Sequence, residues 1–285
     1  MQRVETTAAL RALLKQWRQS GDRIAFVPTM GDLHAGHLAL VKEARQHAER
    51  VVVSIFVNPL QFGENEDFDH YPRLLERDSE KLKAVGVDLL FSPPVAEVYP
   101  NGLQGVVRVD VPTISSILCG ASRPGHFSGV ATVVSKLLNM VQPDCAVFGE
   151  KDFQQLLVIK KLVSDLCFSS EIIGVPTCRE IDGLAMSSRN RYLTDSQRQQ
   201  APMLNQALQK AKKAVTGASL VDFQKIAEQA TISLNKSGFK VDYFEVRRAA
   251  DLAKPMRDND EFVILVAAWL GSARLIDNVR VPIPR

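Results

Sequence analysis

Two histidines stand three residues apart in the segment PTMGDLHAGHLAL, residues 28–40. His34 and His37 enclose Gly36, and Gly31 precedes them by a few residues. Imidazole N–H groups are donors that can stabilise the negative charge of a phosphoryl group during its transfer. Glycines allow the backbone to approach a ligand closely. These residue types at this spacing therefore indicate a site for a phosphate-bearing ligand.

Two other interpretations of the histidine pair stay open at this point. A histidine near the start of a helix often has a purely structural role. Two histidines at this spacing could also bind a metal ion, with Asp32 or Asp69 as a third ligand. The common phosphate-binding loops do not decide between these interpretations, because the chain has no G-x-x-x-x-G-K-[ST] segment and no G-x-G-x-x-G after a strand.

A second candidate segment is FGEKDFQQ, residues 148–155, at another expected strand-to-helix turn. Lys151 can reach a phosphate, Asp152 a metal ion or a ribose hydroxyl, and Gln155 a polar substrate. A solvated helix start with ordinary charged residues would have the same composition. The segments NPLQFG at 58–63 and RPGHF at 123–127 also place polar groups next to expected strand or helix ends.

A third candidate segment is DGLAMSSRNR, residues 182–191. Hydroxyl side chains beside arginines can clamp a phosphate. A loop of this kind at a domain junction can close over a nucleotide. Composition alone would equally fit an ordinary linker.

The elements that must position these segments alternate between strand and helix as far as residue 176. Strands are expected at residues 24–27, 51–57, 87–91, 106–111, 145–148 and 172–175, and helices at 37–47, 77–85, 127–141 and 152–166. This alternation predicts a Rossmann-like parallel sheet with helices on both faces. Such sheets bind ligands at the carboxyl ends of their strands, where the histidine pair is expected.

The pattern changes after Cys178. Thr194 and Gln197 form a capping box that opens a long polar helix, and Ser219 opens a second helix that ends near Gly238. Strands expected at 240–246, 261–270 and 273–276 form a small antiparallel sheet. The sequence therefore predicts two domains, an α/β domain of residues 1–177 and a smaller α+β domain of residues 178–285.

The composition narrows the class of protein. The chain has 285 residues, 46% of them hydrophobic, which is enough for one large core or two moderate ones. Its net charge of +3 is far from the basic excess of a dedicated nucleic-acid binder. No signal peptide or membrane span is expected. The four cysteines lack C-x-x-C spacing and are expected to be reduced and mostly buried, which favours a soluble cytoplasmic protein.

Five segments together, in their order and spacing, closely resemble the pantothenate synthetases: PTMGDLHAGH, FVNPLQFG, RPGHFSGV, FGEKDFQQ and GLAMSSRNRYL. These enzymes belong to the wide superfamily of nucleotidyl-transferring enzymes with a His-x-Gly-His motif. The resemblance covers nearly the whole N-terminal part and the junction. It implies a ligase that uses ATP to join pantoate to β-alanine, through pantoyl-adenylate, with release of pyrophosphate and AMP. It also implies Mg²⁺ on the nucleotide phosphates, a homodimer, and a lid role for residues 178–285 over an ATP- and pantoate-binding domain.

The resemblance also implies roles for individual residues. The catalytic groups would be His34, His37, Lys151 and Arg189. ATP would contact Met30, Gly31, Asp32, Leu33, His34, Ala35, Gly36, His37, Gly149, Glu150, Lys151, Asp152, Cys178, Met186, Ser187, Ser188 and Arg189. The substrates would contact Met30, Gln61, Arg123 and Gln155, and Asp78 would bind Mg²⁺. Cys178 stands where relatives have an aliphatic residue whose backbone meets adenine, and a backbone contact would survive this change.

Three alternatives to a ligase remain. A nucleotidyltransferase of the same fold would move AMP onto a small phosphorylated molecule and stop there. A regulatory protein could bind ATP without catalysis, although the presence of His37, Lys151 and Arg189 argues against it. A tRNA synthetase is disfavoured by the nearly balanced charge and by the lack of a segment resembling a tRNA-binding appendage.

Overall fold

The computed structural model describes residues 1–63, 66, 68–217, 222–256 and 261–282. Contacts divide the chain into two compact units. The first unit comprises Met1–Glu150 and Val158–Pro176, and the second comprises Lys151–Leu157 and Thr177–Arg285. Residues 151–157 thus group with the second unit, which the predicted division at residue 177 did not include.

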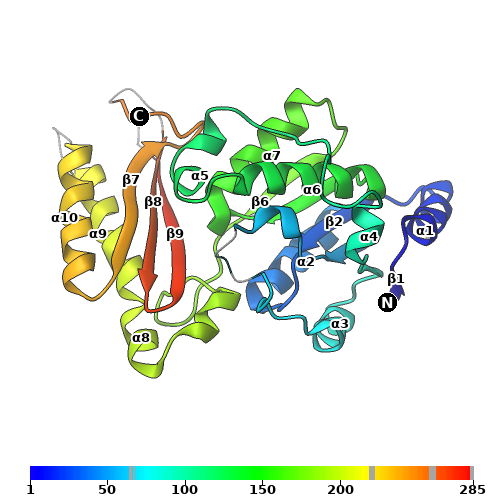
Figure 1. The fold of residues 1–285 in the computed structure, drawn as a ribbon, viewed down its shortest axis with the longest axis horizontal. Coiled ribbons are helices and arrows are strands. Elements are labelled where there is room, and N and C mark those ends of the chain that lie inside the picture. The colour runs from blue at the N-terminus through cyan, green and yellow to red at the C-terminus, as the bar shows by residue number, and fades with distance from the viewer. Residues whose placement is uncertain (64–65, 67, 218–221, 257–260, 283–285) are drawn as a thin grey trace. The chain divides into compact units, whose positions relative to one another are not determined.

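Six of the described strands form one parallel sheet in the first unit, in the order β1-β4-β3-β2-β5-β6 (Figure 1). Their bounds are β1 Gln2–Val4, β2 Ile24–Thr29, β3 Arg50–Ile55, β4 Leu89–Phe91, β5 Cys145–Gly149 and β6 Glu171–Val175. The central strands are continuous apolar runs, as strands covered on both faces must be. The predicted parallel sheet is therefore confirmed.

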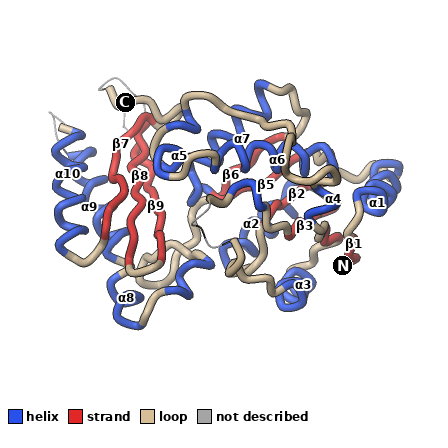
Figure 2. Tube along the Cα trace, viewed as in Figure 1, coloured by secondary structure: helices blue, strands red, loops and turns tan. Residues whose placement is uncertain are grey.

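Helices connect these strands on both faces of the sheet (Figure 2). Their bounds are α1 Thr7–Gln19, α2 Ala35–His47, α3 Leu75–Ala84, α4 Val95–Val98, α5 Cys119–Ser122, α6 His126–Val141 and α7 Phe153–Asp165. From β2 the chain moves through α2 to β3 on one side, whereas α6 leads to β5 on the other side of β2. Since parallel crossovers are right-handed, these opposite directions place α2 and α6 on opposite faces.

The reversal of direction between β2 and β5 creates a topological switch point. Ligands of open α/β sheets bind at such points, outside the carboxyl ends of the strands. The turn after β2 carries the histidine pair, and the turn after β5 begins at Glu150. The sheet therefore places the histidine pair and the start of the segment 148–155, as far as Glu150, at its ligand-binding edge.

One predicted strand of the first unit is wrong. Residues 106–111 form no strand, and the Val109 N–H donates to Thr132 Oγ1 of α6 at 3.0 Å instead of to a neighbouring strand. Val107 is 83% exposed, so the alternating pattern does not face a core. Two N-terminal elements, β1 and α1, were not predicted. The Thr6 side chain caps α1 by accepting from Ala9 N–H.

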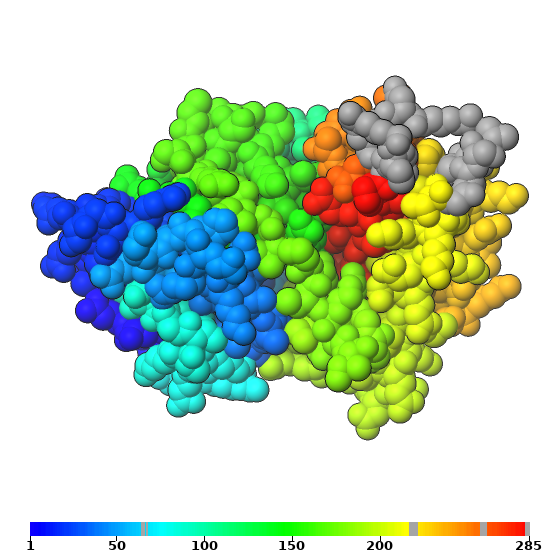
Figure 3. Space-filling view, turned by 180° about the vertical axis from the view of Figure 1, so that it is seen from behind, coloured from blue at the N-terminus to red at the C-terminus, as the bar shows by residue number. Residues whose placement is uncertain are grey.

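The second unit contains an antiparallel sheet in the order β7-β8-β9, as predicted. Its strands are β7 Lys240–Arg248, β8 Glu261–Leu270 and β9 Ala273–Pro282, and its helices are α8 Asp195–Gln200, α9 Met203–Gly217 and α10 Phe223–Lys236. Apolar side chains of α9, α10 and the sheet form one core, which includes Leu208, Leu234 and Ile264. The outer sides of α9 and α10 lie on the surface, yellow in Figure 3.

The helices of the second unit confirm one prediction and correct another. The capping box of Thr194 and Gln197 is present. The long helix that it was expected to open ends at Gln200, and α9 begins only after Pro202, since proline cannot donate within a helix. The predicted helix start at Ser219 lies outside the described residues. The structure begins α10 at Phe223, where Asp222 accepts from Lys225 N–H.

The cysteines and the helix lengths bear on the remaining expectations. Cys119 and Cys145 are buried, Cys178 is half-buried and Cys167 is exposed, and all four are free thiols. Burial raises the pKa of Cys145 to about 11. In the part of the chain that the structure describes, no helix is both long enough and apolar enough to cross a membrane.

Candidate active site

The turn between β2 and α2, residues 30–34, has an unusual backbone. Gly31 and Asp32 have φ angles of 85° and 50°, and a Cβ atom added at Gly31 would lie 3.2 Å from Asp78 Oδ2. Asp78, on α3, is 1% exposed, and its carboxylate accepts from Asp32 N–H at 2.7 Å and Leu33 N–H at 2.9 Å. The turn is therefore held open by a buried carboxylate. The role of Asp78 as a Mg²⁺ ligand stays a prediction.

His34 and His37 form a capping box at the start of α2. His34 Nδ1 accepts from Gly36 N–H at 3.1 Å, and His37 Nδ1 accepts from His34 N–H at 3.3 Å. Because a backbone N–H only donates, the neutral form of each ring carries its proton on Nε2. The ring centroids lie 4.2 Å apart. Two Nε2–H donors therefore stand beside the positive end of a helix, an arrangement suited to phosphate.

The metal-site interpretation of the pair gains no support. Among the residues that the structure describes, no group of three or more His, Cys, Asp or Glu side chains could hold a metal ion. Asp32 and Asp69 thus do not complete such a site with the two histidines.

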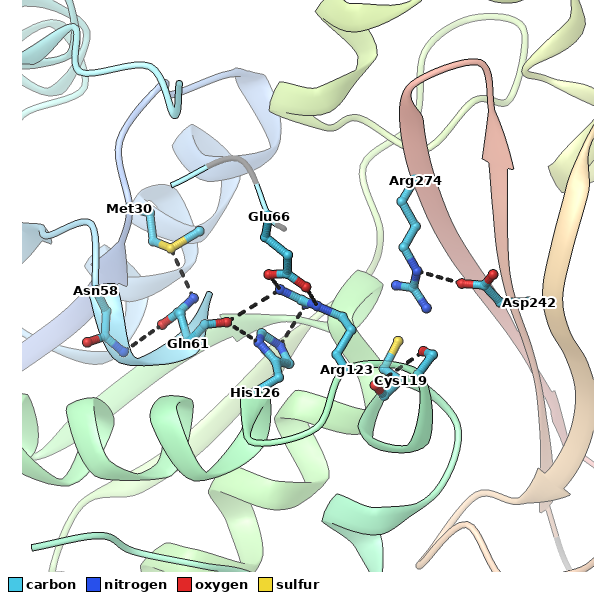
Figure 4. Close-up of polar contacts among 10 residues, drawn as sticks. Met30, Asn58, Gln61, Glu66, Cys119, Arg123, His126, Asp242 and Arg274 are labelled. Atoms are coloured by element: carbon cyan, nitrogen blue, oxygen red, sulfur yellow. Dashed lines mark hydrogen bonds and ion pairs between the residues drawn. The ribbon is translucent and has the colours of Figure 1, made fainter. Parts of the chain in front are cut away.

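A buried amide network lies after β3 (Figure 4). Gln61 ends the short 3-10 helix Pro59–Gln61, and its Nε2 donates to Met30 Sδ at 3.0 Å. Its Oε1 accepts from Asn58 Nδ2 at 3.1 Å. Tyr99 donates its hydroxyl to Asn58 Oδ1 at 2.7 Å, and burial raises the pKa of Tyr99, which keeps this donor protonated. A thioether is a weak acceptor, so a substrate oxygen could replace Met30 as the partner of Gln61.

A glycine of α6 makes this network possible. Gly129 accepts at its carbonyl from Asn58 Nδ2 at 3.1 Å. A Cβ atom added at Gly129 would lie only 2.2 Å from the Leu60 carbonyl oxygen. A larger residue would therefore push Leu60 and the adjacent Gln61 away from α6.

A series of hydrogen-bonded side chains, Glu66, Arg123 and His126, holds the backbone of Gln61 (Figure 4). His126 Nδ1 lies 2.8 Å from the Gln61 carbonyl oxygen, and Arg123 Nη1 lies 3.0 Å from His126 Nε2. Since arginine only donates, His126 donates from Nδ1 and accepts at Nε2. Arg123 also donates to both carboxylate oxygens of Glu66 at 2.6 Å. Burial would raise the pKa of Glu66, but the hydrogen bonds and charge of Arg123 outweigh it and hold this pKa below its usual value.

The turn after β5 begins within the first unit. Gly149 ends β5, and Glu150 starts the 3-10 helix Glu150–Asp152. A Cβ atom added at Gly149 would meet only Leu40, at 4.0 Å. The fold itself therefore tolerates a side chain there, and the space is open to a ligand.

The continuation of this turn belongs to the second unit. Lys151 Nζ lies 3.3 Å from Asp152 Oδ2, and its side chain is one-fifth exposed. The Lys151 carbonyl accepts from Asn278 Nδ2 of β9 at 2.9 Å. Gln155 is half-buried on the first turn of α7. The ammonium group of Lys151 is thus carried on a backbone that β9 holds in place.

Residues 178–186 form a hairpin in the second unit. Met186 N–H donates to the Cys178 carbonyl at 3.0 Å, so the backbone oxygen of Cys178 already has a partner. Ser187 follows the hairpin and caps the 3-10 helix Ser188–Tyr192, its Oγ accepting from Arg189 N–H at 3.3 Å. The hairpin therefore determines where the segment that carries the Ser187 hydroxyl and the Arg189 guanidinium begins.

An ion pair between the half-buried Arg179 and the buried Asp277 fixes the hairpin to β9. Arg179 Nη1 and Nη2 donate to Asp277 Oδ2 and Oδ1 at 2.7 and 2.9 Å. Arg179 also donates to the Gly183 carbonyl at 3.0 Å. Burial raises the pKa of Asp277, and the charge of Arg179 opposes this effect.

The structure gathers most of the predicted residues of the first unit. Around the carboxyl ends of β2, β3 and β5 it places Met30, Gly31, Asp32, Leu33, His34, Ala35, Gly36, His37, Gln61, Gly149 and Glu150, with Arg123 behind Gln61. Sequence reasoning missed the supporting residues Tyr99 and Gly129 in the first unit and Arg179, Asp277 and Asn278 in the second. The pair Asp277-Asn278, polar within an apolar strand, was the available signal.

The parallel sheet and the histidine pair at the turn between β2 and α2 define a Rossmann-like α/β protein of the His-x-Gly-His type. The chain belongs to the pantoate-beta-alanine ligase family, which matches residues 2–280.

Individual relatives agree with this family. The pantothenate synthetase of Shewanella loihica is 52% identical over 279 residues, 98% of each chain. The crystal structure of pantothenate synthetase from Thermus thermophilus has a TM-score of 0.91 at 46% identity and covers 100% of both chains. The pantoate-beta-alanine ligase of Francisella tularensis, complexed with beta-gamma ATP and beta-alanine, has a TM-score of 0.82 at 36% identity and covers 98% of this chain and 97% of that one.

Proposed function

We propose that the protein condenses pantoate with β-alanine at the expense of ATP, giving pantothenate, AMP and pyrophosphate in coenzyme A biosynthesis. The observation that carries this proposal is the capping box of His34 and His37 at the switch point of the sheet. It presents Nε2–H donors where a phosphate-bearing ligand would bind. Membership of the ligase family and the ATP and β-alanine named for the Francisella relative support the same reaction.

The first step joins pantoate to AMP. A carboxylate oxygen of pantoate attacks the α-phosphorus of ATP, and the bond from that phosphorus to the bridging oxygen breaks as pyrophosphate leaves. Negative charge grows on the phosphoryl oxygens in the transition state. Donors that are already oriented stabilise such charge most effectively. We assign this role to His34 and His37, and to Lys151, Ser187 and Arg189 for the remaining phosphate oxygens.

The second step transfers the acyl group. The neutral amine of β-alanine attacks the acyl carbon of pantoyl-adenylate, a C–N bond forms, and the C–O bond to AMP breaks. The nitrogen gives up one proton and AMP leaves with the electron pair of the broken bond.

Gln61 and Gln155 are the proposed contacts of pantoate. The Nε2 group of Gln61 can exchange the weak Met30 Sδ acceptor for a substrate hydroxyl or carboxylate oxygen. Arg123 is proposed as a further substrate contact. Glu66 already occupies two of the donors of Arg123. Arg123 also orients Gln61, because it contacts His126, which donates to the Gln61 carbonyl.

The remaining ATP contacts are proposed as the resemblance implies them. Residues 30–37 and 149–152 would border the nucleotide, with Asp152 near the ribose. The backbone of Cys178 would approach adenine, and Met186 and Ser188 would complete the segment around Ser187. Residues 1–177 would then bind ATP and pantoate, and residues 178–285 would act as a lid.

Mg²⁺ is proposed to enter as the Mg-ATP substrate. The carboxylate of Asp78 binds two backbone N–H groups and lies 4.0 Å from Lys81 Nζ, a donor set that fits a structural role better than a resident cation. A direct Asp78–Mg²⁺ contact remains a prediction that a substitution can test. We also propose that the enzyme acts as a homodimer in the cytoplasm, without nucleic acid or membrane partners.

Pyrophosphate release tests the proposed function. Purified protein would be incubated with Mg-ATP and pantoate, and β-alanine would be added afterwards. We expect pyrophosphate only when pantoate is present, and AMP with pantothenate after β-alanine is added. Adenylylated product that accumulates without any need for an amine would instead indicate a nucleotidyltransferase. ATP binding without pyrophosphate in either mixture would indicate a non-catalytic protein.

A further inference from the structure

Two segments of the second unit share one partner strand. The hairpin of residues 178–186 leads directly to Ser187 and Arg189, and the turn at Lys151 carries an ammonium group. Both segments bond to neighbouring residues of β9, Asp277 and Asn278. We refer to Arg179, Asp277 and Asn278 as the β9 brace.

Arg179 acts on both arms of the hairpin. Its backbone pairs with Ala185 on the opposite arm, and its guanidinium donates to the Gly183 carbonyl at the tip. The same guanidinium donates to both oxygens of Asp277 and to the Asn278 carbonyl at 3.2 Å. A planar fork held by four acceptors allows one orientation only. The hairpin is therefore fixed in direction as well as in position.

Asn278 connects the other segment to the same place. Its Nδ2 donates to the Lys151 carbonyl at 2.9 Å, and its N–H donates to Asp277 Oδ1 at 2.7 Å. Asp277 and Asn278 are 3% and 6% exposed, so solvent does not replace these bonds. The two segments are 98 and 127 residues from these partners in sequence, and the brace relates one segment to the other.

The energetics argue that the brace serves orientation. A buried ion pair usually contributes little more to stability than well-packed apolar residues would, because both ions lose their hydration. What the pair provides is a fixed geometry, because two hydrogen bonds join the guanidinium to the carboxylate. Orientation of this kind matters where several donors must meet one charged ligand, since small displacements reduce rates strongly.

We propose that Arg179, Asp277 and Asn278 are positioning residues for the phosphates of ATP. They hold the Lys151 turn and the Ser187–Arg189 segment in one fixed relation, so that both reach the same phosphate groups. This inference rests on the proposed function and extends it to residues that do not touch substrate. The brace affects ATP only through the two segments that it positions, and it leaves the β-alanine contacts unaffected.

The test compares three variants in the full-length enzyme. Arg179→Lys keeps the charge but loses the fork, and Asn278→Leu removes the donor to Lys151 while leaving the ion pair intact. Arg280→Lys is the matched control, because Arg280 binds both oxygens of Glu261 on the same sheet but touches neither segment in those bonds. We expect the first two to raise the KM for ATP by about tenfold or more and to lower the rate of pyrophosphate formation. The KM for β-alanine should not change in any variant.

Two further measurements keep the outcomes distinct. Calorimetric titration with a non-hydrolysable ATP analogue reports nucleotide affinity without catalysis, and thermal unfolding reports stability. A lowered melting temperature with an unchanged KM for ATP, or an equal rise in every KM, would show that the brace is only structural and would overturn the proposal. If Arg179→Lys does not fold, Asn278→Leu decides. A wild-type enzyme that forms no pyrophosphate would refute the proposed function, and the analogue titration would still decide whether the brace positions a nucleotide site.

Discussion

The two candidate phosphate-binding regions are built in opposite ways. The histidine turn of the first unit caps its own helix, with each Nδ1 bonded to a backbone N–H two or three residues away. The hairpin of the second unit depends on Asp277, 98 residues from Arg179 in sequence. A local site follows from local residue types, whereas a braced site requires the tertiary fold. The two regions should therefore respond differently to substitution.

The largest expected effect is loss of stability on breaking the brace. Arg179→Met leaves the buried carboxylate of Asp277 without its cation, which should reduce the free energy of unfolding by about 3–5 kcal/mol. Urea unfolding checks this. Arg280→Met is the control, because the exposed pair with Glu261 should contribute only about 0–1 kcal/mol. Equal losses in the two variants would show that the Arg179 pair is no different from a surface pair.

The histidine turn should show the converse behaviour, a loss of activity without a comparable loss of stability. His37→Ala removes one oriented donor, which should lower the turnover rate by about a hundredfold or more, on the order of 3–4 kcal/mol. His47→Ala controls for loss of a histidine from the same helix, where His47 pairs with Glu43. Steady-state pyrophosphate assays and melting curves give both quantities. Near-normal turnover in a folded His37→Ala enzyme would remove the catalytic role.

The sequence predicted the local region far better than the braced one. His34 and His37 act through neighbours in the chain, so their spacing already indicated a strand-to-helix turn. The bonds from Asp32 and Leu33 to Asp78 are tertiary, and the spacing did not indicate them. The parallel sheet followed from apolar runs such as Val51–Val53, each of which is fully buried. Asp277 and Asn278 gave only the weak signal of two polar residues in a strand. The strand predicted at residues 106–111 was wrong because an alternating pattern without burial does not define a strand.

Asp78 offers the next effect in size, and it separates a structural role from a metal-binding one. Asp78→Asn removes the charge that two backbone N–H groups share, which should cost about 1.5–3 kcal/mol of stability. Asp69→Asn, at an exposed acid, is the control. Thermal unfolding measures the loss, and titration of activity with Mg²⁺ tests the alternative. A rise in the Mg²⁺ requirement without a change in stability would identify Asp78 as a metal ligand.

His34→Gln should have a smaller effect than His37→Ala. The glutamine amide retains both an acceptor for the Gly36 N–H and a donor for a phosphate oxygen, so the cap and one donor can survive. Turnover should fall by about tenfold or less, since a retained hydrogen bond limits the loss to about 1 kcal/mol. The same pyrophosphate assay applies. A loss as severe as that of His37→Ala would mean that the imidazole ring itself is required at His34.

The smallest effect concerns two arginine–carboxylate pairs, one in each unit, whose pKa shifts have opposite signs. Arg123 holds the pKa of Glu66 below 4.5, so this pair stabilises the fold above that pH and the contribution is lost as the pH falls through the lowered pKa. Burial raises the pKa of Asp277 above 3.8, so its contribution is fully present below that pH and declines as the pH rises through the raised pKa.

Melting temperatures across the acidic range separate these two contributions. The stability difference between the wild type and Glu66→Gln should grow as the pH rises through this range. The difference between the wild type and Asp277→Asn should shrink over the same interval, because the ionised carboxylate is the less favourable form in the fold. Parallel curves for the two variants would mean that Arg179 compensates fully for the burial of Asp277. In that case the brace would stabilise the fold as a surface pair does, and its geometry alone would distinguish it from the Arg123 pair.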